Sequence, residues 1–192
     1  MEGNLVSLTT PLCNIGWKAK DFNLLGVDGK YWTPAKAIGE NGLVVMFICN
    51  HCPYVKAIFD RLILDLAELK KIGINAVAIS SNDPTNYPED SYVNMKKISE
   101  LKMFDFPYLF DESQEVARAY NAICTPDFFG FNESLELQYR GRFDSTGRGE
   151  PTEGNERDLF NAMTLVSKTR SGPTKQFHSV GCSIKWKEIN QI

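Results

Sequence analysis

Several features that assign a chain to a common functional class are missing from this sequence. No apolar run in its 192 residues reaches the roughly 18–20 residues that span a bilayer. A membrane is therefore not an expected partner, and because the net charge is −3 without a basic stripe, nucleic acid is not one either. No basic stretch followed by an apolar one opens the chain, and a cytoplasmic location is therefore predicted.

Metal-binding and cross-linking patterns are equally scarce. The chain has two histidines and five cysteines, and an odd number of irregularly spaced cysteines does not indicate a disulfide-stapled secreted module. A structural zinc site needs four ligands, and the chain has neither a second C-x-x-C motif nor an H-x₃₋₅-H motif. We therefore expect no metal and no other cofactor. The 43% of hydrophobic residues is enough to bury a sizeable core.

The strongest positive signal is the C-x-x-C motif at residues 49–52. It follows the apolar run 43–48, which predicts a buried strand, and precedes an amphipathic helix expected from about Pro53 to Lys71. A thiol at the start of a helix meets free backbone N–H groups and the positive end of the helix dipole. Both favour the thiolate, which is the form that attacks disulfides. We expect Cys49 to be the exposed thiol of lower pKa and Cys52 the shielded one.

The remaining pattern alternates strands and helices. Residues 74–80 predict a second buried strand, so 43–80 form a βαβ unit with parallel strands. The polar, proline-containing loop 81–88 follows that strand, at the edge where α/β folds usually bind ligands. The other expected elements are a hairpin at 21–25 and 30–32, helices at 92–103, 112–120 and 156–169, an extended segment at 106–110, and an antiparallel hairpin at 127–131 and 135–140.

This order of elements, with C-x-x-C opening the first long helix, resembles the thioredoxin fold. Segments 82–88, 124–129, 139–144 and 181–187 are similar to the peroxiredoxin-like, or redoxin-domain, branch of that superfamily. The resemblance implies an α/β protein with a central mixed sheet flanked by helices, an N-terminal hairpin and a helical insertion. We expect a thioredoxin-like domain over residues 1–170 and a C-terminal tail over 171–192, packed on or near the domain.

The resemblance also implies a role for the segment just before the second hairpin. Thioredoxin-like proteins have a cis-proline there, which packs against the C-x-x-C motif. Pro126 takes that position and Thr125 the position before it, and both are expected to help bind a partner. His51 stands immediately before the second motif cysteine, as in disulfide isomerases. A cation or donor there stabilises the Cys49 thiolate and makes the disulfide a stronger oxidant.

The sequence departs from the family pattern at several positions. Peroxiredoxins hold their peroxidatic cysteine in a P-x-x-x-T/S-x-x-C motif. If Cys52 took that place, the Thr/Ser position would be Cys49 and the proline position Val45. Thioredoxin has an aspartate where this chain has Leu43, so the base that assists the second cysteine is unidentified.

We predict a thiol–disulfide oxidoreductase that acts on a protein dithiol or disulfide or on a small thiol. Cys49 attacks and Cys52 resolves the mixed disulfide; Cys124 and Cys182 are candidate accessory thiols, and Cys13 is expected to be structural or incidental. One alternative is a thiol peroxidase of the peroxiredoxin type. Another is a copper or zinc module in which Cys49 and Cys52 bind metal with His178 or Cys124. The sequence leaves the oligomeric state open.

Overall fold

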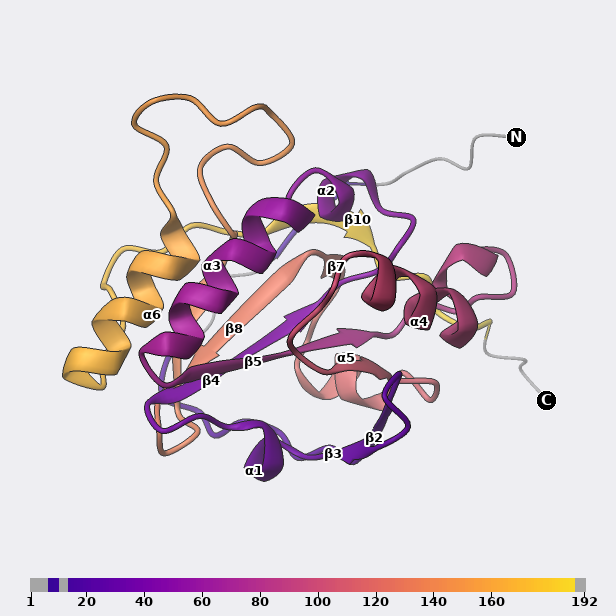
Figure 1. Cartoon of the computed structure of the whole chain (residues 1–192), viewed down its shortest axis with the longest axis horizontal. Helices are drawn as coiled ribbons and strands as arrows, with labels where there is room; N and C mark the ends of the chain where they lie inside the picture. The colour runs from indigo at the N-terminus through magenta and orange to yellow at the C-terminus, as the bar shows by residue number, and fades with distance from the viewer. Residues whose placement is uncertain (1–6, 11–13, 189–192) are drawn as a thin grey trace.

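The structure is a computed structural model that describes residues 7–10 and 14–188. Its centre is a seven-stranded sheet with the strand order β3-β2-β6-β5-β4-β8-β9 (Figure 1). These strands are β2 (Leu24–Gly26), β3 (Tyr31–Trp32), β4 (Gly42–Phe47), β5 (Ile74–Ser80), β6 (Tyr108–Phe110), β8 (Asp127–Phe131) and β9 (Leu137–Gly141). Because β4 pairs in parallel with β5 and antiparallel with β8, the sheet is mixed, as the sequence predicts.

Helices cover both faces of this sheet, so β4 is buried on both sides. Val44 and Met46 belong to one hydrophobic core, and Leu43, Val45 and Phe47 belong to the other. Successive side chains of a strand point to opposite faces, so the continuous apolar run supplies two layers at once. The first core contains residues of α3 (Phe59–Lys71), α4 (Tyr92–Leu101) and α6 (Asp158–Thr169), and the second contains residues of α1 (Pro34–Ala37) and α5 (Glu115–Ala119).

The helix expected from Pro53 to Lys71 is interrupted. It consists of α2 (Pro53–Lys56) and α3, which are separated by a turn in which the Ile58 N–H donates to the Val55 carbonyl at 3.1 Å. Val55 and Ile58 are both buried β-branched residues, with 0% and 3% exposure. Such residues favour a helix less than unbranched ones do, and the tighter turn places both side chains in the core. The interruption makes α2 a separate short element directly after the motif.

Both predicted hairpins are present. β2 pairs antiparallel with β3, and β8 pairs antiparallel with β9. β9 begins two residues later than predicted. The Asn132 side chain accepts hydrogen bonds from the backbone N–H groups of Ser134 and Glu136, and Leu135 has a left-handed φ of 58°. These features lengthen the turn.

A second, three-stranded antiparallel sheet lies beside α2 and has no counterpart in the sequence prediction. It joins β1 (Ser7–Thr9), β10 (Val180–Ser183) and β7 (Cys124–Thr125) in the order β1-β10-β7. Its strands are two to four residues long and come from distant parts of the chain, so no local pattern indicates them. β10 lies in the segment predicted as a tail, and its pairing brings that segment next to the motif.

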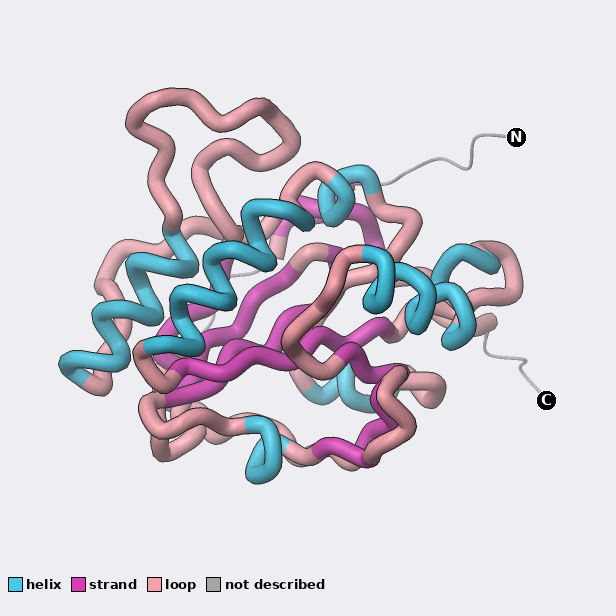
Figure 2. Tube along the Cα trace, viewed as in Figure 1, coloured by secondary structure: helices cyan, strands magenta, loops and turns pink. Residues whose placement is uncertain are grey.

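Two loops complete the description. The loop 142–157 between β9 and α6 projects away from the sheet (Figure 2). The loop after β5 contains a short 3₁₀ turn, η1 (Pro88–Asp90), and leads into α4. No helix in the described ranges 7–10 and 14–188 is long and apolar enough to cross a membrane.

Candidate redox site

The C-x-x-C motif lies between the end of β4 and the start of α2. Cys52 is the N-cap residue of α2, and its carbonyl accepts the N–H groups of Val55 at 3.1 Å and Lys56 at 2.9 Å. Pro53 occupies the first helical position, where its missing N–H removes no hydrogen bond. Both cysteines are reduced, and both have 0% exposure. Cys52, and not Cys49, therefore lies at the helix N-terminus.

Thr125 contacts both motif sulfurs. Its hydroxyl lies 3.2 Å from Cys49 Sγ, and its carbonyl oxygen lies 3.2 Å from Cys52 Sγ and accepts the S–H proton while Cys52 is a thiol. The peptide bond between Thr125 and Pro126 is cis, as the sequence predicts. Short strand β7 thus brings the predicted partner-binding residues to the motif across more than 70 positions of the chain.

Of the two candidate accessory thiols, Cys182 lies directly at the motif. Its Sγ is 2.9 Å from Cys52 Sγ. β10 pairs with β7 in a register that sets Cys182 opposite Thr125. Cys124 precedes Thr125 and therefore points to the other face of the small sheet. Its sulfur lies 3.9 Å from the Pro126 carbonyl oxygen, and burial raises the pKa of this thiol.

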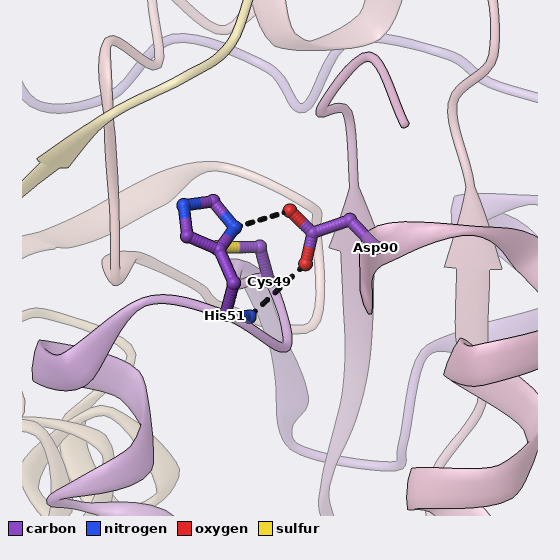
Figure 3. Close-up of side chains that lie close together, drawn as sticks. All are labelled: Cys49, His51 and Asp90. Atoms are coloured by element: carbon purple, nitrogen blue, oxygen red, sulfur yellow. Dashed lines mark hydrogen bonds and ion pairs between the residues drawn. The ribbon is translucent and has the colours of Figure 1, made fainter. Parts of the chain in front are cut away.

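His51 and Asp90 form the polar side of the site (Figure 3). His51 Nδ1 donates to Asp90 Oδ2 at 2.5 Å, and the His51 ring stacks on Tyr87 with 4.6 Å between ring centroids. Asp90 Oδ1 accepts the backbone N–H groups of Asn50 at 2.7 Å and His51 at 3.1 Å, and Oδ2 also accepts the Asn82 amide at 2.8 Å. One fully buried carboxylate therefore holds both the imidazole and the backbone of the motif loop.

The sequence analysis missed Asp90. The signal that pointed toward it was the polar loop that follows β5, but the prediction stopped at residue 88 and named no residue as a partner of His51. Asn50, inside the motif, was also missed; its side chain donates to the Glu89 carbonyl and accepts the Tyr108 hydroxyl. These two residues bind the motif loop to η1, to the loop after β5 and to the start of β6.

The predicted exposure and pKa order of the two motif thiols need correction. The pKa of Cys52 is lowered by hydrogen bonds from the thiols of Cys182 and Cys49 and from the backbone N–H of Val55. Burial raises the pKa of Cys49, and its hydrogen bond to Cys52 and the nearby Asp90 carboxylate raise it further. The prediction that Cys49 is the exposed thiol of lower pKa is wrong, because Cys49 is buried three residues before the helix cap.

The fold does not bring together the metal site considered as an alternative, in which Cys49 and Cys52 would bind metal with His178 or Cys124. Among the described residues, the cluster that could hold a metal ion comprises Cys49, His51 and Asp90, whose ligand atoms lie within 4.8 Å of one another (Figure 3). His178 is not part of it; it lines a pocket of about 560 Å³ with Gln138 and Phe177. A structural zinc site needs four ligands, and this cluster offers three. Two of them, His51 and Asp90, are already hydrogen-bonded to each other.

Comparison with known proteins places the site in a wider context. The AhpC/TSA family model matches residues 15–143. A crystal structure of an uncharacterized conserved protein from Geobacillus kaustophilus is 40% identical, with a TM-score of 0.91 over 97% of this chain and 99% of that one. A hypothetical protein from Sinorhizobium meliloti 1021 is 36% identical, with a TM-score of 0.85 over 93% of this chain and 98% of that one. No curated protein matches the chain.

More distant structures share the fold. A putative thiol:disulfide interchange protein DsbE from Chlorobium tepidum is 18% identical and has a TM-score of 0.61, covering 80% of this chain and 97% of its own. The peroxidoxin BcpB from Mycobacterium tuberculosis is 16% identical, with a TM-score of 0.57 over 80% of this chain and 94% of that one. At these identities the likeness concerns the thioredoxin-like architecture, in which the C-x-x-C motif lies at the end of β4.

Proposed function

The chain belongs to the AhpC/TSA family, and on that premise we propose that its Cys49–Cys52 pair catalyses thiol–disulfide exchange. The partner is a protein dithiol or disulfide, or a small thiol. The observation that carries the proposal is the contact of both motif sulfurs with Thr125, each at 3.2 Å, next to Pro126. Two thiols that are held against one backbone segment and hydrogen-bonded to each other are positioned to close into a disulfide.

Of the two motif thiols in the reduced site, Cys52 carries the negative charge, because its pKa is the lowered one. Cys49 keeps its proton in this state because it is desolvated and lies near Asp90. Its thiol is hydrogen-bonded to the Cys52 thiolate, which is positioned to take up the Cys49 proton, although the lowered pKa of Cys52 makes it a weak base.

Exchange then proceeds in two balanced steps. Cys49 passes its proton to Cys52 and attacks one sulfur of the partner disulfide, and the partner's other sulfur leaves as a thiolate. That thiolate takes the proton from Cys52, which attacks the mixed disulfide at Cys49 and releases the second partner thiolate. The site ends as the Cys49–Cys52 disulfide, and the partner ends as two reduced sulfurs.

Variants in which one cysteine is replaced by serine test this scheme, with a peptide disulfide as substrate. We expect Cys52→Ser to accumulate a mixed disulfide on Cys49, visible by intact mass, and Cys49→Ser to lose at least about 100-fold of the reduction rate, as expected for removal of a nucleophile. Cys124→Ser is the matched control, because this thiol faces away from the motif, and it should retain the rate. Full activity in Cys49→Ser would refute the scheme.

A second candidate function, thiol peroxidase, is favoured by one observation, the lowered pKa of Cys52. A thiolate is the form that peroxides oxidise. The P-x-x-x-T/S motif is absent, because Val45 and Cys49 occupy its two key positions. Peroxide consumption by the reduced protein decides between the two functions. Under our proposal, the second-order rate constant stays within about tenfold of that of a free thiol of matched thiolate content.

A further inference from the structure

Cys52 has two thiol neighbours, and the proposed function uses only one of them. Cys182 Sγ lies 2.9 Å from Cys52 Sγ, closer than two sulfurs in van der Waals contact. Both residues are buried, with 0% and 1% exposure. Two features fix Cys182 in place. β10 is paired on both sides, with β1 and β7, and the Tyr54 backbone N–H donates to the Cys182 sulfur.

We propose that the oxidised protein exchanges between two internal disulfides, Cys49–Cys52 and Cys52–Cys182. The inference rests on the proposed function, since it starts from the disulfide that thiol–disulfide exchange produces. Cys182 attacks Cys52 Sγ, the Cys49–Cys52 bond breaks, and Cys49 leaves as a thiolate that takes up the proton lost by Cys182. One S–S bond forms as one breaks, so no external oxidant or reductant takes part.

The pKa of Cys182 depends on whether Cys52 is reduced or oxidised. While the site is reduced, the pKa of Cys182 is raised chiefly because its thiol donates to Cys52, and further by burial and by the Cys52 charge. Oxidation of Cys52 removes that acceptor and that charge. The positive charge of Lys185 and the Tyr54 N–H remain, and both lower the pKa of Cys182. Cys182 therefore becomes easier to deprotonate when a disulfide is available for it to attack.

The rearrangement changes what the site offers to a partner. In the Cys49–Cys52 form neither motif cysteine is a nucleophile. In the Cys52–Cys182 form Cys49 is again a free thiol beside Thr125, whose hydroxyl lies 3.2 Å from its sulfur. The protein then stores one disulfide between α2 and β10 while Cys49 can attack a second partner disulfide.

Peptide mapping distinguishes the two disulfides directly. Trypsin cleaves after Lys36 and Lys56, so Cys49 and Cys52 share the peptide 37–56, whereas Cys182 lies in the peptide 176–185. A Cys49–Cys52 bond leaves peptide 37–56 lighter by two hydrogens. A Cys52–Cys182 bond links the two peptides. The protein is equilibrated with mixtures of oxidised and reduced glutathione, quenched with acid, alkylated and digested without reduction.

In Cys49→Ser, where Cys52 is the sole cysteine of its peptide, we expect the 37–56/176–185 link to exceed any link from Cys52 to Cys13 or Cys124 by at least about tenfold. Cys49→Ser/Cys124→Ser is the matched control and should keep the link, whereas Cys49→Ser/Cys182→Ser should lose it. In the otherwise unchanged chain, Cys182→Ser should remove the link and leave only the disulfide within 37–56.

Two results would overturn the inference. One is a Cys49→Ser protein whose Cys52 stays reduced or carries only glutathione. The other is a link from Cys52 to a different cysteine. The failure of the proposed function looks different: in that case the unsubstituted chain forms no disulfide within 37–56 at any glutathione ratio, whatever Cys49→Ser does.

Discussion

His51 Nδ1 donates to the buried Asp90 carboxylate at 2.5 Å. An imidazole that can stabilise a thiolate and a carboxylate that destabilises one therefore lie together beside Cys49. Asp90 destabilises a thiolate at the site, because its negative charge raises the pKa of Cys49. The influence that the sequence assigns to His51 alone therefore belongs to the pair. Changes to the two residues should act in opposite directions on the redox couple.

The first prediction concerns the reduction potential of Cys49–Cys52. We expect Asp90→Asn to raise it, because the reduced, thiolate-containing form is stabilised, and His51→Ala to lower it, because Asp90 then lacks its partner. Each shift should be on the order of 30 mV, equivalent to about 1.4 kcal/mol for this two-electron couple. A glutathione series measures both. Asp83→Asn, the same change at a partly exposed position of the loop, is the control, and shifts of equal sign would contradict the pairing.

The second prediction separates the hydrogen bond of Cys182 from its redox chemistry. Cys182→Ala removes the first donor to Cys52, so the thiolate titration of the reduced protein, followed by ultraviolet absorbance, should move up by about one pH unit. The Cys52 thiolate is then protonated at a higher pH than in the parent protein. Cys182→Ser keeps a hydrogen-bond donor to Cys52, so its titration should stay close to that of the parent protein. If Cys182→Ala leaves the titration unchanged, Cys182 does not stabilise the thiolate.

A third prediction uses the close packing of β10 on β7. A Cβ on Gly181 would lie 2.1 Å from the Thr125 carbonyl oxygen. Gly181→Ala must therefore move Thr125, and we expect it to lower the free energy of unfolding by about 1–3 kcal/mol and to change the alkylation rates of Cys49 and Cys52. Gly149→Ala is the control, since its Cβ would be 3.4 Å from the nearest atom. Urea denaturation and timed alkylation measure both effects.

The fourth prediction follows from Asp127, next to Pro126. Burial raises the pKa of Asp127 to about 6, although Arg140 and Ser179 donate to its carboxylate. A carboxyl group whose pKa is higher in the folded state binds more protons there, so its contribution to stability is present below about pH 4 and is lost as pH rises through about pH 6. The loss amounts to about 3 kcal/mol.

Urea denaturation between pH 4 and pH 7 tests this contribution. Asp127→Asn should remove the fall in stability across that interval, whatever its effect at one pH. An identical pH profile in the parent and the variant would show that Asp127 stays ionised in the folded protein.

The sequence predicts the central sheet well because its signals are local. The apolar run of β4, the run of β5 and the helical periodicity of α3 each lie within one element, and each element occurs where it was expected. The break between α2 and α3 was missed because Val55 and Ile58 fit the helical pattern, and only the packing around them shows that the chain turns there.

The site was predicted in part for the same reason. The residues 49–52, 125 and 126 carry a recognisable pattern, so the motif and its neighbouring proline were found. The protonation states were assigned incorrectly because they depend on Asp90 and Cys182, which reach the motif through η1 and β10. Neither element has a local pattern, since η1 is a single turn and β10 is a strand of four residues.

The pairing of β10 with β7 also has consequences for folding during synthesis and for truncated fragments of the protein. Cys52 and Cys182 are 130 positions apart, so the environment of the motif is incomplete until nearly all described residues have been synthesised. Contacts of such long range form late, because the loop between them must close first. During synthesis Cys49 and Cys52 are therefore ordinary thiols, open to stray oxidants. A fragment that ends before Val180 would retain the complete central sheet but would lack the surroundings that give the motif its chemistry.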